Sequence, residues 1–187
     1  QLLSKGFHFP KLNCIVVVDS NFSSHGYDLR SAEKNIQLYH QLSGRAGREG
    51  NTSTIYFQTY TPNDEILLNI SKNDPHAFLR KELLLRKEKK LPPFFRLISF
   101  IVSGKNEQLT SKFAIYLKSS LPKLDYVDIL GPVGAPIYKI KNKYRYRILI
   151  RYPKDLFIQK YLKPVLKNIK ILTGIKLGVD VDPINFS

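Results

Sequence analysis

The residues from Gln41 to Arg48 have the side-chain types and spacing best suited to chemistry in this chain. The run reads Gln41-Leu42-Ser43-Gly44-Arg45-Ala46-Gly47-Arg48. Its glycines permit backbone conformations that other residues avoid, so two arginines can be aimed from one tight turn. A guanidinium is permanently charged and forked, and it therefore suits the charge that develops on a transferring phosphoryl group. Arg45 and Arg48 are the candidate catalytic residues.

The sequence around this run alternates between strand and helix patterns. Residues 13–19 form a β-branched run typical of a strand buried on both faces of a parallel sheet, and Cys14 within it is expected to be a small buried side chain. Residues 31–43 have helical spacing, and residues 54–59 predict the next strand. This order predicts an α/β fold with a parallel sheet in the first part of the chain.

The second part of the chain has the pattern of a separate α+β domain. Asp74-Pro75 is typical of a helix start, and Pro92-Pro93 ends the charged helix that follows. Strands are predicted over 97–103, 127–130 and 176–182, a hairpin over 136–152 with its turn at 141–143, and helices over 107–121 and 155–172. Pro164 is expected either to kink the last helix or to mark its true start. We expect two helices on a small mixed sheet, and domains over 1–70, 71–93 (a connecting helix) and 94–187.

Positive charge is concentrated in the second part. Residues 1–80 carry 8 Lys and Arg against 7 Asp and Glu, a net +1, whereas residues 81–187 carry 22 against 8, a net +14. This asymmetry favours a polyanionic partner for the second part, and a lysine-rich surface without a specific partner is the alternative. The single cysteine excludes an internal disulfide and a multi-cysteine zinc site in this chain. The chain has no Met, so we expect it to be a segment of a longer protein.

Alternation along the predicted hairpin separates basic from aromatic side chains. In a strand over 144–152 the even-numbered residues share one face, and Arg145, Arg147 and Arg151 share the other. The preceding strand alternates in the same way with Lys139, Lys141 and Lys143, so all six would form a basic ladder if the register pairs the two sets. Such a ladder suits phosphate contacts and predicts DNA binding with little sequence specificity. The tyrosines are expected in the core, with stacking on unpaired bases as the alternative.

Two motifs and several landmarks resemble a known family. Gln41 to Arg48 fits Q-x-x-G-R-x-G-R, the sixth conserved motif of superfamily 2 helicases, and the run Gln1-Leu2-Leu3-Ser4-Lys5-Gly6-Phe7-His8-Phe9-Pro10 resembles the fifth. His8 stands where many relatives have Asp, and His at this place is familiar in the PriA branch. Pro92-Pro93-Phe94, Leu130-Gly131-Pro132-Val133 and Asp180-Val181-Asp182-Pro183 are similar to PriA landmarks and follow in the same order. The chain therefore resembles the C-terminal portion of PriA helicases.

That resemblance implies the end of a RecA-like motor lobe followed by a binding domain. The parent would be a cytoplasmic, ATP-dependent helicase that moves 3′ to 5′ on DNA at stalled or branched forks and promotes primosome assembly. Arg45 and Arg48 would contact the nucleotide phosphates, and the nucleotide site would also include Gln41, Gly44, Gly6 and His8. ATP and Mg²⁺ would be bound mainly by the other motor lobe, and zinc elsewhere in the parent protein. The implied partners are forked and single-stranded DNA, single-strand binding protein and primosome proteins, with no membrane.

Two alternatives stay open from the sequence. No G-x-x-x-x-G-K-[ST] occurs, so the chain alone is expected to bind DNA without hydrolysing ATP. The first alternative is therefore a non-catalytic basic module that binds nucleic acid or protein. The second is another superfamily 2 enzyme, such as a RecG-like helicase, which would share residues 1–60 but not the later landmarks.

Overall fold

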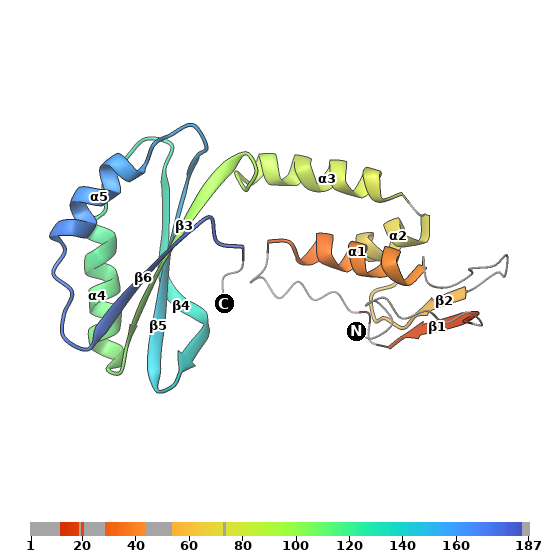
Figure 1. The fold of residues 1–187 in the computed structure, drawn as a ribbon, viewed down its shortest axis with the longest axis horizontal. Coiled ribbons are helices and arrows are strands. Elements are labelled where there is room, and N and C mark those ends of the chain that lie inside the picture. The colour runs from red at the N-terminus through yellow and green to blue at the C-terminus, as the bar shows by residue number, and fades with distance from the viewer. Residues whose placement is uncertain (1–11, 19, 21–28, 44–53, 73, 185–187) are drawn as a thin grey trace. The chain divides into compact units, whose positions relative to one another are not determined.

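The computed structural model describes residues 12–18, 20, 29–43, 54–72 and 74–184 (Figure 1). The chain divides into two compact units, Gln1–Glu82 and Leu83–Ser187, and each is described by itself. The boundary between them falls inside the segment 71–93 that the sequence assigns to a connecting helix. Helix α3 (Pro75–Glu88) spans this boundary. No helix in the described ranges is long and apolar enough to cross a bilayer.

The first unit is built on a two-stranded parallel sheet. Strand β1 (Cys14–Val17) pairs with β2 (Thr54–Phe57), with Ile15 opposite Ile55. Helix α1 (Ser31–Ser43) lies between them in sequence and has the predicted bounds, and α2 (Glu65–Lys72) follows β2. Both helices pack on the sheet through a small apolar core that contains Ile15, Tyr39, Leu42, Val17, Ile55, Phe57 and Ile70. The predicted α/β order with parallel strands is confirmed for the described part of this unit.

The expectation that β1 is buried on both faces is wrong for the described structure. Ile15 is buried, but Val16 is 60% exposed and Val18 is 71% exposed. Cys14, expected in the core, is also exposed. The reason is that, among the described elements, α1 and α2 cover one face of the sheet and the other face stays open. A β-branched run reports suitability for a strand, and it does not report how many faces are covered.

The second unit is a four-stranded antiparallel sheet with two helices on one face (Figure 1). Strands β3 (Phe95–Gly104), β4 (Asp128–Ile140), β5 (Lys143–Pro153) and β6 (Ile175–Val181) form the order β4-β5-β3-β6. Helix α4 (Glu107–Ser120) follows β3, and α5 (Gln159–Asn168) follows β5. The prediction of a mixed sheet is therefore wrong, because every pair in this sheet is antiparallel. The two-helix α+β composition is as expected.

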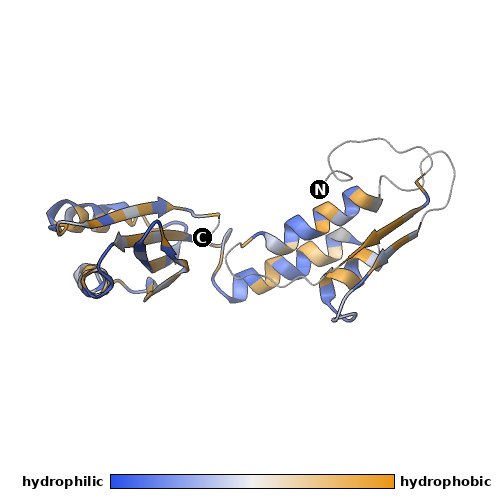
Figure 2. Ribbon diagram, turned by 90° about the horizontal axis from the view of Figure 1, so that it is seen from below, coloured by the Kyte–Doolittle hydropathy of each residue, from blue (hydrophilic) through white to orange (hydrophobic). Residues whose placement is uncertain are grey.

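The core of the second unit lies between this sheet and its helices. Even-numbered residues of β3 and β5 point toward the helices, and Figure 2 shows the alternation of hydrophilic and hydrophobic residues along the strands. The buried cluster includes Ile98, Phe100, Val102, Phe113, Leu117, Ile148, Ile150, Tyr152 and Leu162. Full burial of one such side chain stabilises the fold by roughly 1.5–3 kcal/mol. This packing gives the sheet one dry face. On the opposite face Leu97 and Ser99 of β3 are also buried, whereas Lys143 at the hairpin end is exposed.

Local signals define the helix ends and the last strand. The Asn106 side chain accepts a hydrogen bond from the Leu109 N–H at 2.9 Å, which caps the start of α4. Helix α5 begins at Gln159, so Pro164 lies inside the helix and does not mark its start. At the end of β6, Asp182 donates its N–H to the Leu97 carbonyl at 2.8 Å. Its carboxylate accepts from Arg96 Nε at 3.1 and 3.2 Å, and this hydrogen bond lowers the pKa of Asp182.

Candidate nucleic-acid interface

The predicted nucleotide residues lie mostly outside the described part of the chain. Arg45, Arg48, Gly44, Gly6 and His8 fall in the segments 1–11 and 44–53, which are not described. Gln41 is described and lies exposed in the last turn of α1, three residues before Gly44. It borders a cavity of about 410 Å³ that is also lined by Glu33, Ile36, Gln37, His40 and Leu79. The structure therefore locates Gln41 alone among the predicted nucleotide residues.

The β4–β5 hairpin carries the other predicted site. Its two strands join through Lys141 and Asn142, whose φ angles are 48° and 59°. Two consecutive left-handed residues are characteristic of the tight turns that match strand twist, and Asn is among the residues that accept this conformation. The pair Ile140–Lys143 closes the turn, so Lys143 begins β5 and is not part of the turn. Lys141 is thereby placed at the exposed tip.

The predicted basic residues of β5 share one face. Lys143, Arg145 and Arg147 lie on the face opposite α4 and α5, because the residues between them point toward the core side. Ser103 of β3 pairs with both Arg145 and Lys176, so Lys176 of β6 joins the same row. We call Lys143, Arg145, Arg147 and Lys176 the basic face. Sequence alone did not identify Lys176 because its place depends on the strand order and register.

The predicted ladder of six basic residues is wrong for Lys139. A register irregularity between Gly134 and Lys139 in β4 pairs Lys139 with Tyr144, an even-numbered residue of the opposite face. The Lys139 ammonium lies 4.7 Å from the centre of the Tyr144 ring, and its nitrogen is 3.4 Å from the Tyr144 hydroxyl. Strict alternation cannot be extended through an irregular strand, because each extra residue moves the following side chains to the other face.

Arg151 is held by protein groups. Its Nε and Nη2 donate to Asp128 Oδ2 at 3.0 and 2.8 Å, and its Nη1 donates to the Lys89 carbonyl at 2.8 Å. The guanidinium thus links β5, the start of β4 and the segment that leads into β3. All three hydrogen bonds occupy donors that a phosphate would need. The geometry fits a structural role for Arg151 better than the predicted DNA contact.

The remaining basic side chains differ in how strongly they are held. Arg145 Nη1 donates to the Ile137 carbonyl at 3.3 Å, and Arg145 and Arg147 are half-buried. Burial lowers the pKa of the Arg147 guanidinium, which nevertheless stays charged at neutral pH. Lys141 and Lys143 are exposed. The acidic residues of this side of the sheet, Asp128 and Asp180, lie toward the end of the sheet away from the hairpin tip. Positive charge therefore concentrates at the hairpin half of the sheet.

A cluster of three tyrosines occupies the other face of the hairpin. The Tyr138 hydroxyl donates to Glu107 Oε1 at 2.6 Å and lies 2.8 Å from the Tyr146 hydroxyl. The Tyr138 ring centre is 5.7 Å from that of Tyr144 and 5.6 Å from that of Tyr146, in edge-to-face geometry. Tyr152 is fully buried, as expected for a core residue, and Tyr146 packs against the core, whereas Tyr138 is 37% exposed. The tyrosines of the hairpin thus divide between core and surface.

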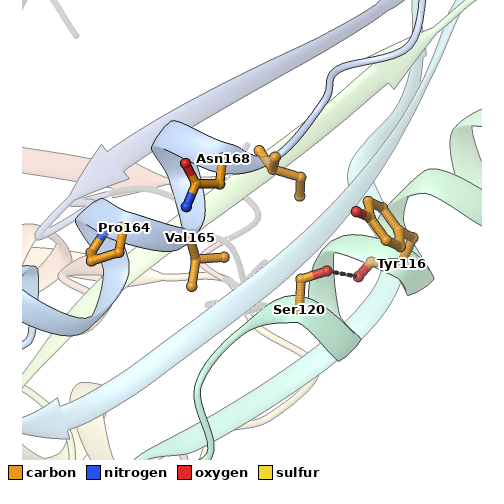
Figure 3. Close-up of a pocket in the computed structure, with 6 residues that line it drawn as sticks. Tyr116, Ser120, Pro164, Val165 and Asn168 are labelled. Carbon is orange, nitrogen blue, oxygen red and sulfur yellow. Dashed lines mark hydrogen bonds between the residues drawn. The ribbon is translucent and has the colours of Figure 1, made fainter.

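The helical side of the second unit has two features that sequence reasoning missed. Tyr116 and Ser120 of α4, with Pro164, Val165 and Asn168 of α5 and the adjacent Ile169, line a cavity of about 310 Å³ (Figure 3). None of these described lining residues carries a positive charge. Helix α5 also has three exposed lysines on one stripe, Lys160, Lys163 and Lys167, and their helical spacing was the signal available in the sequence.

Comparisons with a protein-family model and with curated proteins match primosomal and replication restart proteins, respectively. Residues 87–184 match the family described as Primosomal protein N C-terminal domain. The replication restart protein PriA of Rickettsia felis is 40% identical over 186 residues, which cover 100% of this chain and 28% of that protein. PriA of Bacillus subtilis is 34% identical, with 98% and 23% covered, and PriA of Treponema pallidum is 30% identical, with 99% and 28% covered. The chain spans about a quarter of the length of these curated relatives.

Proposed function

Because this chain belongs to the PriA family of replication restart proteins and corresponds to their C-terminal portion, we propose that it forms part of an ATP-dependent DNA helicase. In this proposal the parent enzyme moves 3′ to 5′, recognises stalled or branched replication forks and promotes primosome assembly in the cytoplasm. Its partners are forked and single-stranded DNA, single-strand binding protein and primosome proteins. The chain alone binds DNA and does not hydrolyse ATP.

The basic face and the hairpin tip are the proposed DNA contact of the second unit. The observation that carries this assignment is the register, which brings Lys143, Arg145 and Arg147 of β5 and Lys176 of β6 onto one face. Alternate residues of a strand are roughly 6.7 Å apart, so the β5 side chains form a regular row of cations. Cations presented in this way suit backbone phosphates and do not read bases, so binding depends on DNA structure and salt more than on sequence.

The first unit is the proposed contribution to the motor. Arg45 and Arg48 would stabilise the charge on the γ-phosphate, and the nucleotide site would include Gln41, Gly44, Gly6 and His8. The support is the order β1-α1-β2 with parallel strands, in which Gln41 lies in the last turn of the helix between the two strands. The open face bearing Val16, Val18 and Tyr56 also supports a larger lobe, because parallel sheets are normally covered on both faces.

The cofactors of the parent enzyme are proposed to bind mainly outside this chain. Among the described residues no group of three His, Cys, Asp or Glu side chains is arranged to hold a metal ion. Mg²⁺ would accompany ATP on the other motor lobe, and zinc would lie elsewhere in the parent. Within this chain, Arg45 and Arg48 would stabilise the charge on the γ-phosphate. The second unit would bind DNA.

A salt titration of DNA binding tests the assignment of the basic face. Replacing Lys141, Lys143 and Arg145 together with alanine should reduce the log–log salt slope by about 0.9 for each phosphate that is no longer neutralised. The matched control replaces Lys160, Lys163 and Lys167 of α5 with alanine, which removes the same charge from the helical side. Equal effects of the two triple variants would mean that net charge alone drives binding, and would remove the basic face from the proposal.

A further inference from the structure

We propose that Tyr138 and Tyr144, with Lys139 beside them, form a stacking site for an unpaired nucleotide on the face of the hairpin opposite the basic face. This inference rests on the proposed DNA binding and deepens it, because it names the residues that would contact the unpaired bases of single-stranded DNA. It concerns residues that the basic face does not use. Tyr138 and Tyr144 lie at the end of the hairpin nearest the tip, past the buried residues of β5.

The cluster is a preformed aromatic surface. The Tyr138 hydroxyl has one proton, which it donates to Glu107, so the hydroxyl of Tyr146 is left to donate to the oxygen of Tyr138. These bonds fix Tyr138 against the first turn of α4, and they raise the pKa of Tyr138, mainly through Glu107. The edge-to-face contact with Tyr138 then fixes Tyr144. Rings that are already ordered lose little entropy when they bind a base.

The chemistry of the cluster favours a nucleotide. Base–aromatic stacking tolerates any sequence because every base has a flat π-face, and single-stranded DNA sites combine such rings with nearby cations. Lys139 supplies the cation, since its ammonium lies 4.7 Å from the Tyr144 ring centre and can reach a phosphate that follows a stacked base. Its charge also offsets that of Glu107, the acidic residue bonded to the cluster. If Tyr138 served only to pack the core, its side chain would be buried, but it is 37% exposed.

The test compares unpaired and paired DNA in the 187-residue chain. Tyr144→Leu should weaken binding of a single-stranded oligonucleotide by roughly 5- to 150-fold, the range expected when one base no longer stacks. Binding of a duplex of the same sequence should change by less than about twofold, because phosphate contacts do not involve this ring. Tyr161→Leu is the matched control, since it makes the same change at a half-exposed tyrosine of α5 outside the cluster. It should leave both affinities unchanged.

A second measurement on the unaltered chain does not depend on the folding of a variant. An oligonucleotide with 2-aminopurine at unpaired positions should lose fluorescence on binding, because stacking on a tyrosine quenches it. Equal loss of single-stranded and duplex affinity in Tyr144→Leu, or absence of quenching with normal binding, would overturn the stacking site and leave the basic face intact. Failure of the unaltered chain to bind either DNA would instead overturn the proposed DNA binding itself, and the stacking site with it.

Discussion

The two sheets of this chain expose different surfaces on the face that their described helices leave open. The parallel pair β1–β2 exposes Val16 and Tyr56, and Val18 directly after β1 is exposed too; all three are apolar or aromatic. On the antiparallel sheet of the second unit this face carries the basic face, in which Lys143 and Lys176 are exposed and Arg145 and Arg147 are half-buried, next to the exposed Val133. Water solvates cations well and apolar side chains poorly, so the same architectural situation has opposite physical consequences. The first face is suited to further protein, and the second to solvent or a polyanion.

This difference between the two faces distinguishes the proposed motor role of the first unit from the proposed DNA binding of the second more clearly than net charge alone does. A net charge of +1 in residues 1–80 would not steer DNA, whereas the apolar face fits a lobe that needs the rest of its sheet. The second unit closes its own core of Phe100, Ile148 and Tyr152, all fully buried, and needs no further protein for that purpose. Three experiments test this division of tasks between the two units.

The largest effect is expected from the arginines of the first unit. In the complete parent enzyme, Arg48→Ala should reduce DNA-stimulated ATP hydrolysis by roughly 10³-fold or more, the range known for arginines that stabilise phosphoryl transfer. DNA affinity should stay within about twofold, because binding is assigned to the second unit. Steady-state ATPase assays with and without DNA, together with a binding titration, measure both. A large loss of DNA affinity in this variant would mean that the first unit also binds DNA, and it would contradict the assignment of DNA binding to the second unit.

A smaller effect is expected from a change at Val16, on the exposed face of the β1–β2 sheet. It tests whether this face is covered in the complete parent protein. Val16→Thr keeps the β-branched shape and adds a hydroxyl, so at a 60% exposed site it should change the free energy of unfolding by less than about 0.5 kcal/mol. In the complete parent the same hydroxyl would be buried, and the cost should rise to about 1–3 kcal/mol.

Ile15→Thr provides the control for that experiment, because Ile15 is 5% exposed in the chain as it stands. It should destabilise both proteins by a similar amount. Urea unfolding followed by circular dichroism gives the values. If Val16→Thr is equally mild in both proteins, the apolar face is not covered by the rest of the lobe.

Periodicity predicted most elements of this fold because it reports local physics, although it missed α2 and divided β4 into two strands. The bounds of α1 were predicted from helical spacing, and the alternation of β5 correctly assigned Ile148, Ile150 and Tyr152 to the core. The family resemblance is also confirmed, since it rested on ordered motifs across the whole chain. These signals depend on residues near one another in sequence.

The register and order of the strands, and the elements that cover each sheet face, could not be predicted from local periodicity. The register irregularity that moves Lys139 to the tyrosine face depends on how β4 fits β5, and the place of Lys176 depends on β6 lying beside β3. The exposure of Cys14 depends on which elements cover β1. Arg151 illustrates the same limit: its alternation with Arg145 and Arg147 is real, but its partners come from Asp128 and Lys89, distant in sequence.

The smallest effect is expected at Arg151. It tests whether this side chain stabilises the second unit or contacts DNA. Arg151→Lys keeps the charge but removes the planar fork that contacts Asp128 and the Lys89 carbonyl together. The pair is partly exposed, with 23% and 38% of the two side chains accessible, so screening limits the loss of stability to about 1 kcal/mol. Thermal unfolding should detect it.

DNA binding by Arg151→Lys should be unchanged in affinity and salt slope, because the side chain is held by protein groups. Lys143→Ala is the opposite case: its exposed side chain has no described role in packing, so stability should be kept while the salt slope falls by about 0.9. A salt slope reduced in Arg151→Lys as well would return Arg151 to the phosphate contacts. The basic face would then extend along the whole of β5, and the two ends of the sheet would no longer differ in function.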